Sequence, residues 1–310
     1  MTLSSSSASL HETAAARLPG LTPYIYGTTR LGDESIPFDD RVAVARAAID
    51  TGSALHTSHT YGTALQVLNT AFDQDRTHVP PFIVKIGWDS VAQVREVIAQ
   101  NLVPLGLTHL PVGQLCFGGA LAEQYRTGGP ENDGLRRLKA EGLVGRFVQE
   151  IWPWNSEVAI DALRGGHNEG IVDGYIFYLN PLQRFASEEL WQMLRERGET
   201  IVAMRTTCGG SLDRLREHGP DYLKARAIQM SPVFERSGCT SWPEFCVRFA
   251  LGYPQVISTV GATARVENLH ELVAAVQNAT PLPAEIQAEI EELQRGWYVE
   301  HDKHAEPWSM

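Results

Sequence analysis

The sequence predicts an α/β protein that folds as a single-domain (β/α)8 TIM barrel. Short apolar runs bounded by turn residues alternate with segments of helical spacing, and counting them gives eight consecutive strand-then-helix units. No break in composition suggests a linker between two domains. With 310 residues, 43% of them hydrophobic, the chain is long enough to bury the core of one large barrel.

Each predicted strand is a short apolar run that ends in a polar or glycine-containing turn. The first, PYIYG, leads into the turn TTRLG, and the third, FIVKI, carries a lysine within its apolar run. The strands are predicted at 23–27, 53–57, 82–86, 111–117, 145–149, 172–178, 200–204 and 256–260.

Helices are predicted after these strands from their apolar spacing and their end signals. Gly52 follows one helical segment as a C-cap residue, and Asn155 begins another as a cap. The helices are predicted at 40–51, 63–73, 90–105, 131–142, 155–163, 187–197, 242–251, 265–277 and 283–295. The segment 205–239 is predicted as a long connection that helps to select the substrate.

The N-terminal segment is predicted to lie outside the barrel. Residues 1–20 begin with a run rich in Ser and Ala, without a basic start or an apolar stretch, and are therefore predicted as a flexible leader. Residues 21–310 are predicted to form the barrel.

The composition indicates a protein that acts on small molecules. Its net charge is -11 and its pI about 5.4, with both signs mixed along the chain, which argues against nucleic-acid and anionic-membrane partners. Cys116, Cys208, Cys239 and Cys246 show no CxxC or metal-like spacing, so a reduced, cytoplasmic protein is expected. No apolar run approaches the length of a membrane span. The sequence does not determine the oligomeric state.

The segment 54–62, ALHTSHTYG, is the centre of the predicted site. Its first half is a buried strand, and the polar run that follows must reach the surface. In a (β/α)8 barrel the residues that follow the strands meet at one mouth, where the chemistry takes place. His56, His59 and Tyr61 are therefore expected at the same mouth as Lys85 of the third strand.

Tyr61 and Lys85 form the predicted acid/base pair, because a nearby ammonium stabilises a phenolate over a phenol. Cys116, after the fourth strand, has two interpretations. It is either a small core residue or a nucleophile whose pKa is lowered by His56 or Lys85.

The remaining mouth residues are candidate substrate contacts. Trp88, Trp152 and Trp154 offer flat aromatic surface to a planar or sugar-like substrate, and His59 and Glu150 accompany them. Ordinary loop packing is the alternative interpretation of the tryptophans.

No metal site is predicted. His56, His59, Cys116 and Glu150 all follow strands, so a barrel would bring them towards one mouth. Their spacing, however, matches no recognised ligand motif.

Six segments spread along the chain carry a further signal. They are YGTTRLG, HTSHTYG, IVKIG, LKAEGLVGRF, VAMRTTCGG and VISTVGATARVENL. In their order and spacing, from about Tyr24 to Leu293, these segments resemble the aldo-keto reductase superfamily. The resemblance implies a barrel that binds NADP(H) or NAD(H) across its mouth and reduces carbonyls by hydride transfer. It also implies that the C-terminal tail folds over this mouth.

The resemblance matches half of the family's catalytic set. Tyr61 matches the family's tyrosine, which donates a proton to the carbonyl oxygen. Lys85 matches the family's lysine, which lowers the pKa of that tyrosine. His56 stands where the family has an Asp, and Cys116 or Phe117 where it has a His. A histidine in place of the carboxylate is expected to depress the pKa of Lys85 or to stay neutral itself.

The resemblance also implies contacts with the cofactor, but this chain does not match the family on the nicotinamide side. Where the family has amide side chains that contact the nicotinamide, this chain has Glu150 and Ile151 (or Trp152 and Pro153) and Ile176.

The phosphate side is matched better. Arg205 with the turn at Gly209 and Gly210 suits a pyrophosphate, and a strand-to-helix turn leads into free helix N–H groups that suit an anion. The residues of that turn are Gly261, Ala262, Thr263 and Arg265. An ordinary strand-to-helix turn is the alternative interpretation.

Three functional hypotheses follow. The first is an NAD(P)H-dependent reductase of a carbonyl, or the reverse oxidation, on a small polar or secondary-metabolite substrate, with Tyr61 as general acid and Lys85 as its tuner. The second is a barrel of the same fold without a cofactor, in which Tyr61, Lys85 and His56 catalyse elimination, isomerisation or hydration. The third is a binding barrel without turnover.

Overall fold

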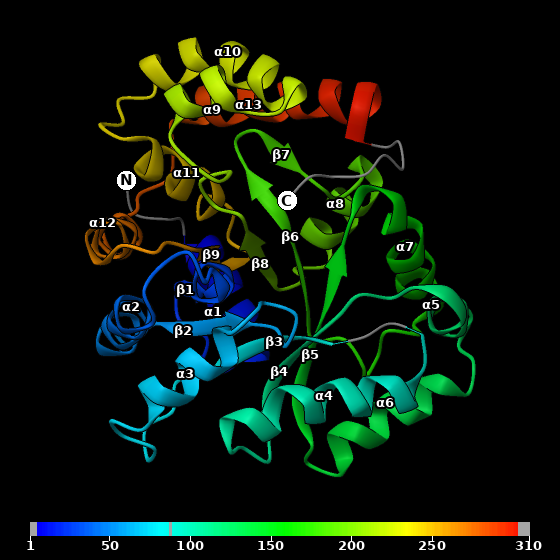
Figure 1. The fold of residues 1–310 in the computed structure, drawn as a ribbon. Coiled ribbons are helices and arrows are strands. Elements are labelled where there is room, and N and C mark those ends of the chain that lie inside the picture. The colour runs from blue at the N-terminus through cyan, green and yellow to red at the C-terminus, as the bar shows by residue number, and fades with distance from the viewer. Residues whose placement is uncertain (1–4, 87–88, 303–310) are drawn as a thin grey trace.

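Eight parallel strands close into a barrel, as the sequence predicts (Figure 1). The structure, a computed structural model, describes residues 5–86 and 89–302. Around the barrel the strands follow one another in chain order, and pairing of the fifth with the sixth closes the ring. They are β1 (Tyr24–Gly27), β2 (Ala54–Thr57), β3 (Phe82–Ile86), β4 (Leu110–Leu115), β5 (Val144–Ile151), β6 (Gly174–Asn180), β8 (Ile201–Met204) and β9 (Val256–Gly261).

The strands are buried along nearly their whole length, because helices cover the outside of the barrel and side chains fill its interior. The predicted helices are confirmed, with small shifts at their ends. They are α2 (Phe38–Asp50), α3 (Ala64–Phe72), α4 (Val91–Leu105), α6 (Glu131–Ala140), α7 (Ser156–Gly165), α8 (Glu188–Glu196), α11 (Trp242–Ala250), α12 (Val266–Gln277) and α13 (Ala284–Trp297).

Side-chain caps fix the beginnings of three of these helices. Ser90, Ser187 and Ser241 each accept a hydrogen bond from the backbone N–H three residues later. Gly106, in the left-handed conformation with φ 66°, ends α4. Short 3-10 turns also follow two strands at the mouth: η1 (Thr28–Gly32) after β1 and η2 (Pro153–Asn155) after β5.

The segment 205–239 is not the featureless connection that the sequence predicts. It contains α9 (Leu212–His218) and α10 (Asp221–Arg236), which gather with α13 in one layer at the top of Figure 1. Pro232 lies inside α10, so the local sequence signal is weak there, and the buried residues of the helix supply the stabilisation instead. Two further elements escape the prediction: α5 (Gly119–Thr127) and the two-residue β7 (Gln183–Arg184), which pairs antiparallel with β6.

The N-terminal leader also differs from the prediction, because α1 (Ser5–Arg17) is an ordered helix over most of it. Its end lies against the side of the barrel where the strands begin. Thr200 donates a hydrogen bond to the Ala14 carbonyl (2.8 Å), and Arg146 donates one to the Arg17 carbonyl (3.2 Å). Ala14 and Leu18 are buried, so this segment closes the bottom of the barrel.

The C-terminal end of the described chain is fixed beside the mouth. Arg226 of α10 forms a buried ion pair with Asp302 of η3 (Tyr298–Asp302), with 2.6 Å between Nη2 and Oδ1. The hydroxyl of Tyr298 donates to the Pro153 carbonyl (3.2 Å), next to the end of β5. The predicted tail over the mouth falls mainly on residues 303–310, outside the described residues. No helix of the described chain is both long and apolar enough to cross a membrane.

Replacing Leu18 with Ala tests whether this N-terminal segment is part of the fold. Leu18 is 1% exposed, so we expect its truncation to lower the free energy of unfolding by about 2–5 kcal/mol. Urea denaturation measures this change. Leu10→Ala is the matched control, because Leu10 is 43% exposed and its truncation should change stability by no more than about 0.5 kcal/mol. Equal effects of the two substitutions would contradict the packing of this segment.

Candidate active site at the barrel mouth

An ion pair between Lys85 and Glu150 lies at the centre of the mouth. Lys85 comes from β3 and Glu150 from β5, with β4 between them, so the two side chains meet inside the barrel. Such contacts follow from the barrel geometry, in which alternate strands contribute to one interior layer. The Lys85 Nζ lies 3.6 Å from Glu150 Oε1, and the carboxylate side chain is only 4% exposed.

The environment of Lys85 keeps it charged. Burial alone lowers the pKa of Lys85, but the negative charge of Glu150, the phenols of Tyr61 and Tyr178, and a hydrogen bond with Tyr61 together outweigh this effect and raise it. Of the two outcomes expected for a histidine at position 56, a depressed pKa of Lys85 is therefore not the one found. Glu150 of β5 supplies the negative charge that faces Lys85.

Tyr61 lies next to Lys85, as the sequence predicts. The Lys85 Nζ is 5.9 Å from the centre of the Tyr61 ring. The turn that carries Tyr61 is closed by its own N–H, which donates to the Ser58 carbonyl (3.1 Å), and by its carbonyl, which accepts from Ala64 (2.9 Å). An ammonium and a phenol thus share one side of the mouth.

Two glycines hold this turn in place. A Cβ on Gly32 would lie 2.0 Å from the Tyr61 carbonyl oxygen, and a Cβ on Gly62 would lie 2.6 Å from the Gly32 carbonyl oxygen. Gly62 also has φ 50°, a left-handed conformation that other residues rarely adopt. The motifs YGTTRLG and HTSHTYG therefore end in glycines because their backbones touch.

His56 stays neutral, which is the second of the two outcomes that the sequence predicts. Burial, followed by the charge of Lys85, lowers the pKa of His56 to about 4. Its Nε2 lies 2.6 Å from Gln114 Oε1. Because an amide oxygen only accepts, Nε2 carries the proton and donates to Gln114. His56 thus adds no charge to the mouth.

Cys116 is a protonated thiol rather than an activated nucleophile. Burial and the charge of Glu150 raise the pKa of Cys116 to about 12, although Lys85 acts in the opposite direction. A side-chain hydrogen bond joins it to Glu150. The thiol therefore donates to the carboxylate, and the nucleophile interpretation has no support in this geometry.

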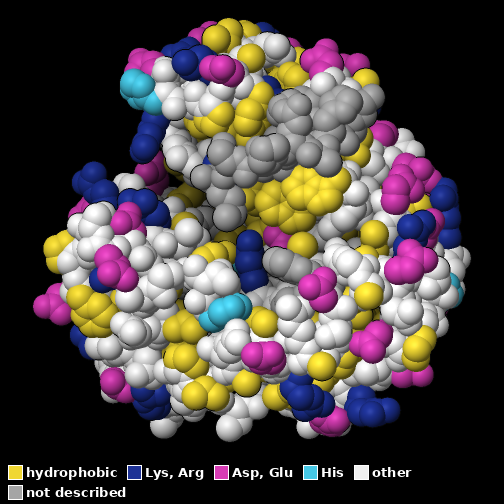
Figure 2. All heavy atoms as spheres, turned by 45° about the vertical axis from the view of Figure 1, so that its right-hand side comes forward, with side chains coloured by type: hydrophobic (Ala, Val, Ile, Leu, Met, Phe, Trp, Pro, Cys, Tyr) yellow, Lys and Arg dark blue, Asp and Glu magenta, His cyan; other side chains and the backbone are white. Residues whose placement is uncertain are grey.

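Four aromatic rings pack together beside the ion pair, and we call them the aromatic wall: Trp152, Trp154, Tyr178 and Phe185, of which Phe185 is fully buried. Trp152 stacks on Trp154 with ring centres 5.0 Å apart, and Tyr178 stacks on Phe185 at 4.6 Å. Trp152 lies 5.4 Å from both Tyr178 and Phe185, which joins the two stacks. Figure 2 shows large hydrophobic side chains gathered next to a Lys or Arg side chain on this face of the molecule. The predicted wall thus exists for Trp152 and Trp154, whereas Trp88 lies outside the described residues.

His59 is turned towards α4 rather than towards the ion pair. Its Nδ1 lies 3.2 Å from the Asn101 side-chain nitrogen, and partial burial lowers its pKa. Among the described residues no group of three or more His, Cys, Asp and Glu side chains is placed to hold a metal ion.

The turn from β9 into α12 is fixed by buried tyrosines from β1. The hydroxyl of Tyr24 donates to the Gly261 carbonyl (3.0 Å), and that of Tyr26 donates to the Thr263 carbonyl (2.7 Å). Arg265 is the N-cap residue of α12, and no side chain caps the free N–H groups of that helix. The first N–H groups of α12 are thus without a side-chain cap, and the anion site at this turn stays a prediction.

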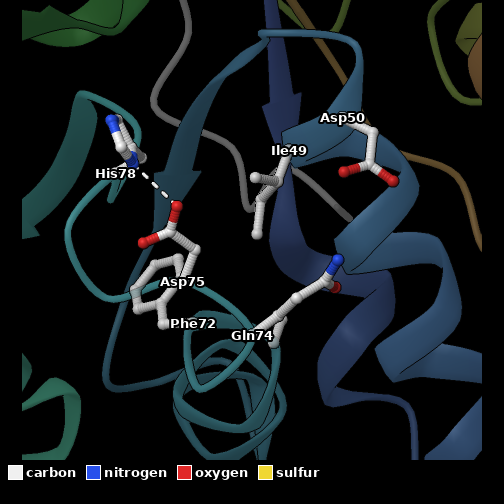
Figure 3. Close-up of a pocket in the computed structure, with 7 residues that line it drawn as sticks. Ile49, Asp50, Phe72, Gln74, Asp75 and His78 are labelled. Carbon is white, nitrogen blue, oxygen red and sulfur yellow. Dashed lines mark hydrogen bonds and ion pairs between the residues drawn. The ribbon is translucent and has the colours of Figure 1, made fainter.

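The cavity drawn in Figure 3 is not part of this mouth. It has a volume of about 200 Å³ and lies between the C-terminal ends of α2 and α3, where His78 Nδ1 is hydrogen-bonded to Asp75 (2.7 Å). Helices of a (β/α)8 barrel end on the side where the strands begin, so this cavity lies on the opposite side from Lys85.

The sequence did not predict how Glu150 acts. It placed Glu150 among the substrate contacts, whereas the structure makes it the partner of Lys85 and Cys116. The available signal was a lone carboxylate at the end of one apolar strand and a lone lysine at the end of another, two strands away. Gln114 was missed because nothing in its local sequence separates it from core residues.

No protein-family model and no curated protein matches this chain. Solved structures do match. A Bacillus halodurans aldo-keto reductase in its holo form aligns with a TM-score of 0.70 at 20% identity, covering 91% of this chain and 95% of that chain. A Klebsiella pneumoniae aldo-keto reductase in complex with NADPH gives a TM-score of 0.66 at 19% identity, covering 88% of this chain and 92% of that chain. A structure of a Klebsiella pneumoniae aldo/keto reductase in complex with NADP and acetate also matches. The chain therefore has the fold of the aldo-keto reductases, as the resemblance in its sequence predicts.

His56 gives the fold a specific sensitivity to acid. Its pKa falls from 6.5 to about 4 in the folded chain, so unfolding takes up a proton between these values and stability falls as the pH falls from 6.5 to 4. We expect this residue to account for about 3 kcal/mol of that loss. Lys85, Glu150 and Gln114 are the groups that face it.

Urea denaturation at several pH values, for the wild type and His56→Gln, measures this contribution. Glutamine keeps an N–H donor for Gln114 but does not titrate. The variant should lose less stability between pH 6.5 and pH 4 than the wild type. Parallel curves would contradict a neutral His56.

Proposed function

We propose that this barrel reduces a carbonyl group on a small substrate, or catalyses the reverse oxidation, with an NAD(P)(H) cofactor. The observation that carries the proposal is the ammonium of Lys85, kept charged by Glu150 and adjacent to the phenol of Tyr61 at the mouth. The Klebsiella aldo-keto reductase of the same fold was solved with NADPH and with NADP. When bound, such a cofactor supplies the hydride.

Tyr61 is the proton donor in this proposal. As the carbonyl oxygen gains negative charge, the hydroxyl of Tyr61 gives it a proton, and the ammonium of Lys85 stabilises the tyrosinate that remains. Glu150 keeps Lys85 charged and holds it in place. Because the His56–Gln114 pair is neutral, it adds no charge beside Lys85, and Glu150 supplies the negative charge that faces the ammonium.

The residues of the phosphate side fit the cofactor better than those of the nicotinamide side. The amino end of α12 has no side-chain cap, and Arg265 stands beside it with an exposed guanidinium. Gly261, Ala262 and Thr263 would hold the phosphate end of the cofactor there, together with Gly209 and Gly210. At the nicotinamide side, Glu150 is an ion-paired carboxylate and Ile176 is a buried aliphatic residue, so neither supplies an amide.

A second candidate is a cofactor-independent elimination, isomerisation or hydration at the same site. The observation in its favour is the Oε1 atom of Glu150, which is buried and accepts no hydrogen bond from the described residues. In this candidate Glu150 takes a proton from carbon, and Tyr61 gives a proton to the leaving or carbonyl oxygen.

Titration with NADPH and the variant Tyr61→Phe separate these candidates. For the reductase we expect micromolar NADPH binding, monitored by fluorescence, in the wild type and in the variant alike. Aldehyde reduction by Tyr61→Phe should fall by at least about a hundredfold, because only the proton donor is lost. Absence of NADPH binding with turnover retained would favour the cofactor-independent enzyme. Absence of any turnover that depends on Tyr61 would contradict both.

Gly32→Ala tests whether the contact between the two mouth loops positions Tyr61. Because the new methyl group would collide with the Tyr61 carbonyl, the turn must move, and we expect kcat to fall by about 10- to 100-fold. Gly296→Ala is the matched control, since Gly296 in α13 has open space around it and its substitution should leave kcat unchanged. An unchanged kcat in Gly32→Ala would show that the contact does not position the tyrosine.

A further inference from the structure

Arg205, directly after β8, has an unusual backbone conformation. Among the described residues, Arg205 and Cys208 are the only non-glycine residues with positive φ, both at 55°. This conformation costs free energy for residues with a side chain, so the surrounding structure must impose it.

Hydrogen bonds from neighbouring elements impose this strain. The Arg205 carbonyl accepts from the Asn180 side chain (3.0 Å) and from the Cys208 N–H (2.8 Å). The thiol of Cys208 donates to Gln183 Oε1 (3.2 Å), and Thr206 is bonded to the Val260 carbonyl. Hydrogen bonds therefore hold the loop after β8 against β6, β7 and β9, and they fix the backbone position of Arg205.

The guanidinium of Arg205 has no anionic partner among the described residues. Its Cζ lies 5.4 Å from the centre of the Tyr178 ring, but within residues 5–86 and 89–302 it forms no salt bridge. The other buried cations near the mouth are neutralised, Lys85 by Glu150 and Arg226 by Asp302. A Cβ on Gly209 would lie 3.4 Å from Arg205 Nη2, so the glycine keeps a side chain off that nitrogen.

Tyr178 connects this cation to the proposed reaction site. Burial raises the pKa of Tyr178, and the charges of Arg205 and Lys85 both act against that rise, so both cations lie near one phenol. Tyr178 also belongs to the aromatic wall, in which Trp154 is 45% exposed. Through Tyr178 the aromatic wall therefore reaches Arg205, and the same phenol lies near Lys85.

We infer that Arg205 binds an anionic group of the substrate, and that the substrate is a ring-bearing carboxylate or phosphate whose ring packs on the aromatic wall. The planar guanidinium suits both anions, because it donates two parallel hydrogen bonds. This inference rests on the proposed reduction and names its substrate class.

The pyrophosphate of the cofactor, to which the sequence analysis assigned Arg205, is the other source of such an anion. Two observations favour the substrate. The guanidinium of Arg205 lies beside the ring of Tyr178 on β6, and the amino end of α12 has no side-chain cap and has its own arginine, Arg265.

The test compares 4-carboxybenzaldehyde with benzaldehyde as substrates, in the presence of NADPH, for the wild type and Arg205→Asn. Asparagine tolerates the left-handed conformation, so it removes the charge without adding strain. Binding of benzoate and of benzyl alcohol, measured by tryptophan fluorescence, provides a readout that needs no turnover. Arg205→Lys is a second variant, which keeps the charge and loses the planar pair of donors, and Arg265→Asn is the comparison at the phosphate side.

We expect the wild type to prefer 4-carboxybenzaldehyde by at least about tenfold in kcat/KM. Arg205→Asn should abolish this preference by raising KM for 4-carboxybenzaldehyde, weaken benzoate at least about tenfold, and affect 4-carboxybenzaldehyde far more than benzaldehyde. Arg205→Lys should lose part of the preference. Arg265→Asn should weaken NADPH and leave benzoate binding intact.

The outcomes separate this inference from the proposed function. Reduction of both aldehydes at equal efficiency would overturn the inference and leave the reductase standing. Benzoate binding that depends on Arg205, without reduction of any aldehyde, would support the inference and overturn the reductase. Weaker NADPH binding in Arg205→Asn, with both aldehydes affected equally, would assign the anion to the cofactor and overturn the inference.

Discussion

The ion pair between Lys85 and Glu150 is the interaction on which the mouth depends. Removing two charges from water is costly, and their attraction offsets that cost only while both partners are present. Glu150 therefore decides that Lys85 remains an ammonium, and Lys85 in turn determines what the neighbouring phenol of Tyr61 can do. Glu150 of β5 supplies the negative charge beside Lys85, and His56 of β2 is neutral.

Backbone contacts set the geometry that the ion pair uses. The loop after β1 and the loop after β2 touch at Gly32 and Gly62, with no room for a side chain on either glycine. The loop after β8 is held in a strained conformation by bonds to three neighbouring strands. Strain of this kind persists only where the surrounding structure over-determines it, and here it lies at the mouth of the barrel. The rigid barrel thus supports loops whose own conformations are unfavourable.

The outer layer of α9, α10 and α13 completes the mouth on the side of β6 and β7 (Figure 1). Arg226 of α10 bonds to the Leu182 carbonyl and to Asp302, and Gln294 of α13 bonds to the Asn180 carbonyl. Asn180 in turn holds the Arg205 carbonyl. The layer therefore reaches Arg205 through Gln294 of α13 and Asn180.

The sequence by itself determined the barrel, because the alternation of apolar strands and amphipathic helices is a local pattern, and it placed Tyr61 and Lys85 at one mouth. It did not determine α1 or α10, whose helices are stabilised by burial against distant segments rather than by local signals. Only the tertiary structure decided that Glu150 faces Lys85, that His56 is neutral and that Arg205 lacks a carboxylate among the described residues. Charge states depend on burial and on partners brought together when the barrel closes, and neither is contained in the spacing of residues along the chain.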